Sequence, residues 1–338
     1  MAHPPLAAYP ALRPRRLRQA PWIRALVRES RLTPADLIWS IVVHGGEDAT
    51  PIAAMPGVSR LSVAGAAAAA REARALGIPA IAVFPHIDAA DKDPRGAAAS
   101  APDGLIARAI AEMKSAAPEI GVICDVALDP FTDHGHDGVV VSGRVDNDRT
   151  IERLIDQGLM QARAGCDVLA PSDMMDGRVG ALRRALEVEG LTETMIMAYA
   201  AKYASAFYGP YREAIGSARL GGGDPAKPAD KATYQMDPAN SDEALREVAL
   251  DIAEGADMVM VKPGLPYLDV IRRVVEAFAM PTFAFQVSGE YAMIAAAAAQ
   301  GWIDEDRAIL ETLTAFKRAG CAGVLTYFAP RAARLLGS

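Results

Sequence analysis

Eight short apolar runs, separated by segments of helix length, are the feature that most constrains the fold of this chain. The runs are rich in Val, Ile, Leu and Met and lack an alternating polar face, while the segments between them are rich in Ala, Glu and Arg. A strand that is apolar on both faces must be covered on both sides. The pattern predicts repeated strand–helix units, with strands at Leu37–Val43, Ala80–Phe84, Gly121–Val126, Cys166–Ala170, Met195–Tyr199, Asp257–Val261, Thr282–Val287 and Gly323–Tyr327.

An open doubly wound sheet and a closed parallel barrel share this local pattern. Eight units in one chain of 338 residues favour the closed form, an α/β fold of the (β/α)8 TIM-barrel type over residues 31–338. Residues 1–30 form a Pro- and Ala-rich stretch that contains Arg13, Arg15 and Arg16. We interpret this stretch as an extended N-terminal arm.

Charge and cysteine content exclude several classes of function. A formal net charge of −7 argues against a nucleic-acid or anionic-membrane partner, because both need a basic surface. No apolar run has the length of a membrane-spanning helix, and the N-terminal stretch lacks the apolar segment of a signal peptide. Cys124, Cys166 and Cys321 are widely spaced in or beside apolar runs, so no disulfide framework is expected. We therefore expect a cytoplasmic protein.

Polar or ionisable side chains stand at or just after the ends of several runs. In a barrel these positions share one face, on which barrel enzymes place their chemistry. Loops are polar in any case, so the prediction depends on convergence from several strands. The residues are Asp125, Ser172, Asp173, Lys202, Lys262, Ser288 and Tyr327.

Two lysines close apolar runs in a chain that has only seven lysines against twenty-eight arginines. Lys202 follows the run that begins at Met195, and Lys262 ends the run that begins at Met258. Loss of hydration and a second ammonium nearby both lower the pKa of a lysine amine. A neutral amine attacks a ketone to give a Schiff base, which acidifies the neighbouring carbon. The alternative is that each lysine pairs with a carboxylate and only orients a loop.

A segment far longer than an ordinary strand–helix connection lies between the two lysines, at about residues 203–236. Long irregular loops in compact domains are usually lids or disordered inserts. This one carries Arg212 and Lys231, cations able to hold a carboxylate, so it is predicted to be a lid over an acidic substrate. The helix that follows is expected to have Asn240 as its N-cap and to stop at Gly255.

Several long motifs stand along the chain at Ala54–Arg60, Ala170–Arg178, Met197–Pro210, Tyr234–Asn240, Met260–Gly264, Gln286–Met293 and Leu325–Phe328. In this order they resemble the porphobilinogen synthase family, also called 5-aminolevulinate dehydratase. The resemblance covers nearly the whole chain and implies a (β/α)8-barrel hydro-lyase of tetrapyrrole (heme) biosynthesis. Such an enzyme condenses two molecules of 5-aminolevulinate to porphobilinogen with loss of two waters.

The resemblance also implies roles for individual residues. Lys202 and Lys262 would form Schiff bases with the first and second substrate molecules respectively. One substrate carboxylate would be held from the lid, by Arg212, Lys231 and Gln235, and the other by Ser288 and Tyr327. Asp125, Ser172 and Asp173 would lie in the pocket. Lid closure would protect the imines from water.

The zinc-dependent branch of the family carries three cysteines where this chain has Ala127, Asp129 and Asp137. Thiolates suit zinc, whereas carboxylates suit hard ions such as magnesium. The chain therefore resembles the aspartate-rich branch, and no catalytic Zn²⁺ is expected. In that branch Asp129 and Asp137 act as acid–base groups or hold a hard cation through water. The nearby His134 and His136 are interpreted as structural.

Glu247 matches the glutamate that in many relatives binds an allosteric, activating Mg²⁺ through water at a subunit interface. The N-terminal arm resembles the one that embraces a neighbouring subunit in a homo-octamer. Hexamers and dimers are alternatives, and magnesium is either required or only activating. Two other functions share the fold: an aldolase-type barrel, which needs one Schiff-base lysine, and a catalytically silent barrel that serves as a scaffold.

Overall fold

The computed structural model describes residues 7–217 and 228–337 and contains two compact units, Met1–Arg31 and Leu32–Ser338. The glycine-rich part of the predicted lid, residues 221–225, lies outside the described residues. Within the described residues, no helix has both the length and the apolar character needed to span a membrane. Cys124, Cys166 and Cys321 are buried and free, as expected.

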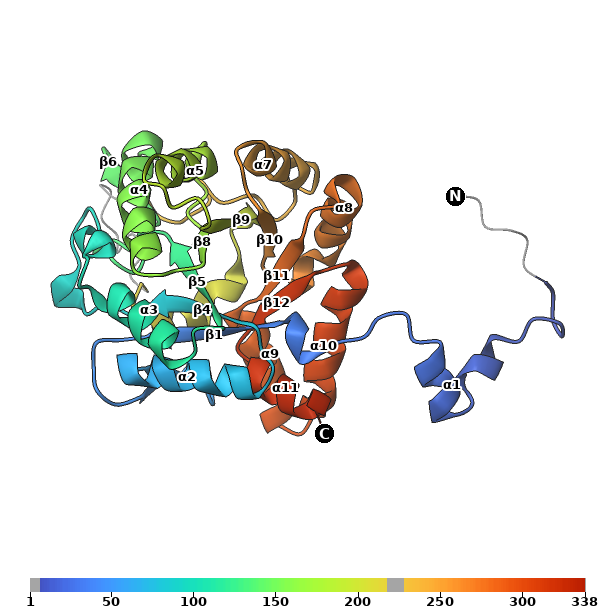
Figure 1. The fold of residues 1–338 in the computed structure, drawn as a ribbon. Coiled ribbons are helices and arrows are strands. Elements are labelled where there is room, and N and C mark those ends of the chain that lie inside the picture. Colours follow the sequence, from blue (N-terminus) through green and yellow to red (C-terminus); the bar gives the residue numbers. More distant parts are fainter. Residues whose placement is uncertain (1–6, 218–227, 338) are drawn as a thin grey trace. The chain divides into compact units, whose positions relative to one another are not determined.

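Eight parallel strands form a closed barrel in the larger unit (Figure 1). Neighbours along the barrel are consecutive in the chain, and pairing of the last strand with the first closes it. The predicted TIM barrel is confirmed, and each strand lies within three residues of its predicted bounds. The strands are β1 (Leu37–Val43), β4 (Ala80–Pro85), β5 (Gly121–Val126), β8 (Val168–Pro171), β9 (Met195–Lys202), β10 (Met258–Lys262), β11 (Thr282–Gln286) and β12 (Gly323–Thr326).

Helices surround the strands and cover their outer faces (Figure 1). Several of them bury one apolar side, as the helical spacing of the segments between strands predicts. The helices of this unit are α2 (Val63–Ala75), α3 (Leu105–Ala116), α4 (Asn147–Arg163), α5 (Arg178–Val188), α6 (Gly209–Ile215), α7 (Asp242–Ala253), α8 (Leu268–Phe278), α9 (Ser288–Ala299), α10 (Glu305–Ala319) and α11 (Ala329–Gly337).

Short strands and 3-10 turns occupy several of the connecting segments. β3 (Ser59–Leu61) extends the sheet beside β1 and pairs with β2 (Thr50–Pro51), and β6 (Val140–Val141) forms a hairpin with β7 (Arg144–Val145). Further 3-10 turns are η2 (Pro34–Asp36), η3 (Ala89–Asp91), η4 (Ala97–Ser100), η5 (Ala206–Tyr208) and η6 (Leu265–Tyr267).

The two ends of helix α7 differ in how well the sequence predicted them. The expectation that Asn240 caps α7 is wrong, because Ser241 occupies the N-cap position. The Asn240 amide instead donates to the Glu243 carboxylate at 2.6 Å, a local bond that competes with capping. The predicted stop is confirmed: Gly255, with φ of +105°, follows the end of the helix.

The N-terminal unit contains the 3-10 helix η1 (Pro14–Arg18) and the short helix α1 (Pro21–Leu26). Neither helix has a buried residue. Trp22 is 69 % exposed and Leu26 is 70 % exposed, so the described part of this unit has no core of its own.

Candidate active site

Lys202 and Lys262 are the last residues of neighbouring strands, β9 and β10, and the strand register pairs them directly. Adjacent strands lie about 4.8 Å apart, so the two side chains start side by side. Both are almost fully buried. They line a cavity of about 20 Å³, with room for about one water molecule. Its other lining residues are Asp129, Tyr208, Tyr211, Arg212, Lys231 and Gln235.

Four aromatic rings surround the Lys262 amine. Its Nζ lies between 4.8 and 5.4 Å from the centroids of these rings. Burial, followed by the charge of the Lys202 ammonium, lowers the pKa of Lys262 to about 7. About half of this amine is therefore neutral, and nucleophilic, at neutral pH. The rings belong to Tyr199, Tyr208, Tyr211 and Phe285.

The Lys202 amine has polar surroundings instead. Its Nζ lies 2.9 Å from Asp137 Oδ1 and donates a hydrogen bond to the backbone carbonyl of Ser172. The sequence suggested that the two lysines activate each other. The structure instead gives the two amines different surroundings, because Lys202 is paired with Asp137 whereas aromatic rings surround Lys262.

Lys231 enters the site from the predicted lid segment and forms ion pairs with both Asp129 and Asp137. Its Nζ lies 2.6 Å from Asp137 Oδ2 and 3.1 Å from Asp129 Oδ2. The Tyr234 hydroxyl also donates to Asp137 Oδ2, at 2.9 Å. Burial alone would raise the pKa of Asp137, but the ammonium groups of Lys202 and Lys231 hold it well below its usual range. The cation predicted to hold a substrate carboxylate thus binds two protein carboxylates here.

Asp125 is the next-to-last residue of β5, and Asp173 stands two residues after the end of the neighbouring β8. Both are buried, but they have different partners. Burial raises the pKa of Asp125 to about 6, and the nearby Lys262 amine opposes that rise. Burial also raises the pKa of Asp173 to about 7. Asp173 accepts the backbone N–H of Met175 at 2.7 Å and lies 3.7 Å from Arg178 Nε. Asp173 therefore contacts a buried arginine that the sequence analysis did not single out.

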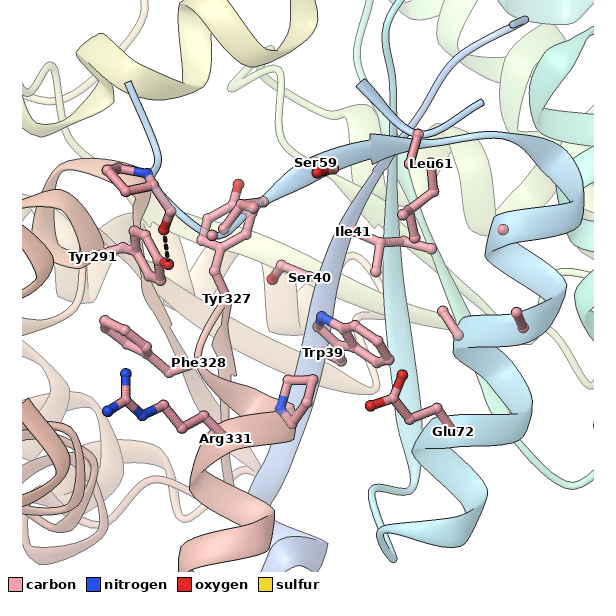
Figure 2. Close-up of a pocket in the computed structure, with 18 of the residues that line it drawn as sticks. Trp39, Ser40, Ile41, Ser59, Leu61, Glu72, Tyr291, Tyr327, Phe328 and Arg331 are labelled. Atoms are coloured by element: carbon pink, nitrogen blue, oxygen red, sulfur yellow. Dashed lines mark hydrogen bonds between the residues drawn. The ribbon is translucent and has the colours of Figure 1, made fainter. Parts of the chain in front are cut away.

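Ser288 and Tyr327 do not line the cavity between the lysines. The Ser288 hydroxyl oxygen accepts the backbone N–H of Tyr211 at 2.9 Å and so connects the start of α9 to α6. Tyr327 lines a separate groove of about 630 Å³ together with Ser40 and Tyr291 (Figure 2). Its buried hydroxyl has no hydrogen-bond partner within the described residues.

Two cations hold the C-terminal end of α6, the helix that carries Tyr211 and Arg212 over the site. Arg60 Nε donates to the carbonyl of Ala214 at 2.8 Å, and Lys92 Nζ donates to the carbonyl of Gly216 at 2.8 Å. Cations are favourable at this end of a helix. Neither residue was predicted, because contacts over more than a hundred residues leave no local pattern.

His136 and Glu247 lie outside the lysine cavity. His136 is buried, with its ring nitrogens 3.1 Å from the Tyr234 hydroxyl and 3.0 Å from the Pro228 carbonyl. Glu247 is half-buried on α7 and lines a polar cleft of about 450 Å³ that includes Asp176 and Glu243. Burial raises the pKa of Glu247.

A closed parallel barrel whose strand ends present two adjacent buried amines defines the class of protein: a (β/α)8-barrel enzyme with lysines at its reaction face. The family model described as "Delta-aminolevulinic acid dehydratase" matches residues 11–335. The chain therefore belongs to the delta-aminolevulinic acid dehydratase (porphobilinogen synthase) family of lyases.

Relatives from distant sources cover almost the whole chain. A delta-aminolevulinic acid dehydratase of Bradyrhizobium diazoefficiens is 61 % identical over 96 % of this chain and 91 % of its own length. One from Rhodobacter capsulatus is 53 % identical over 98 % of both chains. A chloroplastic one from Physcomitrium patens is 50 % identical over 96 % of this chain and 74 % of its own.

A solved structure agrees in fold as well as in sequence. The delta-aminolevulinic acid dehydratase of Toxoplasma gondii, in complex with its reaction product porphobilinogen, superposes with a TM-score of 0.92. It is 49 % identical and covers 98 % of this chain and 92 % of its own.

Proposed function

We propose that this chain catalyses the reaction of its family through two Schiff bases. Two molecules of 5-aminolevulinate condense asymmetrically to porphobilinogen with loss of two waters, one bound through Lys202 and the other through Lys262. The observation that carries this proposal is the register that pairs two buried lysines at the ends of β9 and β10. An aldolase-type barrel needs only one such lysine, and a silent scaffold needs neither.

Lys262 is the amine that is ready to react. As a neutral amine it attacks the ketone carbon of its substrate to give a carbinolamine, which expels water to form the iminium ion. Asp125 is the ionisable group matched to these proton transfers, because its pKa of about 6 lies close to neutrality. It donates a proton to the departing hydroxyl and takes one back later.

The partner of Lys202 is Asp137, which at 2.9 Å is the base within reach when the Lys202 amine attacks its substrate. A substrate carboxylate that draws Lys231 away removes one of the two ammonium groups that depress the pKa of Asp137. Asp137 then becomes a stronger base. Binding of a substrate on the lid side therefore activates Lys202 in this scheme. Lys231 leaves Asp129 as well as Asp137 when it moves to the substrate carboxylate.

The segment at about residues 203–236 acts as a lid in this proposal. A cavity of about 20 Å³ does not admit two substrates, so Lys231, Gln235 and Arg212 must move apart for entry. Together they hold one substrate carboxylate after closure. Ser288 and Tyr327 hold the other, which gives the unpartnered Tyr327 hydroxyl an acceptor.

Members of the family use zinc or magnesium. We propose an allosteric Mg²⁺, bound through water by Glu247, because a half-buried carboxylate in a roomy polar cleft suits an ion that keeps its waters. When bound, the ion supplies a fixed positive charge at α7. The chain's aspartate-rich motif does not suit zinc: Ala127 offers no ligand, and Lys231 binds both Asp129 and Asp137.

We also propose that the enzyme is cytoplasmic, does not bind nucleic acid or membranes, and assembles as a homo-octamer through its arm, residues 1–30. The exposed apolar side chains of the arm, such as Trp22 and Leu26, support this role.

Trapping of the imines tests the proposed reaction. The protein is incubated with 5-aminolevulinate and borohydride and digested, and reduced adducts are located by mass spectrometry. We expect adducts on both Lys202 and Lys262, and a pyrrole product in the absence of borohydride. An adduct on one lysine alone would favour a single-imine mechanism. No adduct and no pyrrole would favour the scaffold.

A further inference from the structure

Glu290 is a fully buried carboxylate that no step of the proposed reaction uses. It stands in the first turn of α9, where its Oε2 accepts the backbone N–H of Val287 at 2.8 Å. This contact alone is an ordinary helix cap. Two further donors come from another part of the chain. Gly264 donates to Oε2 at 3.2 Å, and Leu265 donates to Oε1 at 2.7 Å.

These donors flank both halves of the proposed site. Gly264 and Leu265 begin the turn that leaves Lys262, while Val287 directly precedes Ser288. One carboxylate therefore joins the end of β10 to the start of α9. The distance between the reactive amine and the proposed carboxylate-binding serine depends on this junction.

The backbone at Lys262 is also restrained by contacts that do not involve Glu290. The carbonyl of Lys262 accepts the backbone N–H of Tyr203 at 3.0 Å and the hydroxyl of Tyr208 at 3.2 Å. A Cβ atom on Gly264 would overlap the ring of Phe316, so the turn has no room to shift toward α10. The backbone on both sides of the Lys262 carbonyl is thus restrained.

The three donors favour the ionised form of the Glu290 carboxylate: burial raises its pKa to about 7, and these backbone N–H groups oppose that rise. Both oxygens accept, and an amide in the same place would turn an NH2 group toward at least one backbone N–H. A buried charge is costly unless it is hydrogen-bonded. The three N–H groups and the N-terminal end of α9 supply that compensation.

We propose that Glu290 is a positioning residue that holds the Lys262 turn against the start of α9 and so aligns Lys262 with Ser288 for imine chemistry. This inference rests on the proposed function of Lys262. Glu290 does not touch the reacting atoms. It acts through backbone N–H groups, and its loss affects Lys262 more than Lys202.

Glu290→Gln tests the proposal with little change in side-chain volume. Because a misplacement of about 1 Å costs about 100-fold in rate, we expect kcat to fall between about 10-fold and 100-fold, with KM changed much less. In borohydride trapping, the ratio of Lys262 adduct to Lys202 adduct should fall. A merely structural role would lower stability and leave that ratio unchanged.

Asp304→Ala is the matched control, because Asp304 caps α10 through the N–H of Arg307 at 2.9 Å and contacts no part of the Lys262 turn. It should lose stability and keep the wild-type adduct ratio. An unchanged ratio and kcat in Glu290→Gln would overturn the positioning role. Failure of the wild-type enzyme to form either adduct would instead overturn the proposed function.

Amide hydrogen exchange of the wild-type protein covers the case in which Glu290→Gln does not fold. We expect the amides of Gly264 and Leu265 to be protected as strongly as those of β10. Fast exchange there, with the start of α9 still protected, would show that Glu290 is only a helix cap.

Discussion

Lys202 and Lys262 occupy the same height on adjacent strands, yet their surroundings give them different chemistry. Aromatic rings enclose the Lys262 amine, whereas the Lys202 amine is paired with Asp137. An asymmetric condensation joins two identical molecules in two different roles. Unequal surroundings distinguish those roles before either substrate is bound, since the Lys262 amine lies among aromatic rings and the Lys202 amine lies against a carboxylate.

The pKa of Lys262 leads to a pH prediction. A lowered pKa means that the reactive neutral form is present above about pH 7 and is lost as the pH falls, so trapping at Lys262 should drop about tenfold per unit below that midpoint. Lys202→Met removes the ammonium that helps to lower this pKa, so the midpoint should move upward. The measurement is the initial rate of borohydride adduct formation at Lys262 from pH 5 to 9.

Lys317→Met is the control for that shift, because Lys317 pairs with Asp36 at 2.6 Å, away from the site. It should leave the midpoint in place. A wild-type midpoint near the ordinary lysine value of about 10.4 would contradict the prediction.

At the scale of elements, the barrel strands were predictable, whereas the short helix inside the longest connection was not. A strand buried on both faces must be apolar throughout, so β1 and β10 can be found from composition alone. Inside the long segment after Lys202, the short helix α6 depends on Arg60 and Lys92 at its end. Such distant contacts leave no periodicity in the sequence.

The candidate site likewise contains residues that the sequence predicts and contacts that it does not. Scarcity of lysine singled out Lys202 and Lys262, the cations of the long loop singled out Lys231, and the family resemblance singled out Asp137. The aromatic wall around Lys262 and the pairing of Arg178 on α5 with Asp251 on α7 arise only when separate βα units meet. Both are products of packing, which residue spacing does not encode.

The next prediction concerns Mg²⁺ binding by Glu247 on helix α7. Glu247→Gln keeps the size of the side chain but removes the charge that attracts a hydrated Mg²⁺. We expect the affinity for Mg²⁺ to fall by at least about tenfold and the stimulation of activity by Mg²⁺ to disappear, while activity without added metal persists. Isothermal titration calorimetry with Mg²⁺ measures the first effect independently of turnover.

Glu276→Gln serves as the comparison, because Glu276 is an exposed carboxylate on α8 paired with Arg272. It should bind Mg²⁺ as the wild type does. Equal Mg²⁺ affinity in the Glu247 and Glu276 variants would place the ion elsewhere.

At the scale of the whole molecule, the two compact units differ in kind. The barrel unit has a continuous apolar core, whereas the helices η1 and α1 of the arm bury no residue. Trp22 and Leu26 expose apolar surface on a segment that cannot bury it within itself. Exposed apolar patches of this kind mark sites of protein association. We therefore expect contacts between subunits to stabilise the arm.

Trp22→Glu in the full chain tests this expectation. Burial of a large apolar side chain contributes about 1.5 to 3 kcal/mol, so a charge at this position in every copy should shift the assembly to fewer subunits. Light scattering coupled to size-exclusion chromatography at micromolar concentration measures the mass. Val188→Glu places the same charge on an exposed apolar residue of α5 and should keep the wild-type mass. If Trp22→Glu and Val188→Glu both keep the wild-type mass, Trp22 lies outside the subunit contacts. If only Val188→Glu loses mass, the interface belongs to the barrel instead.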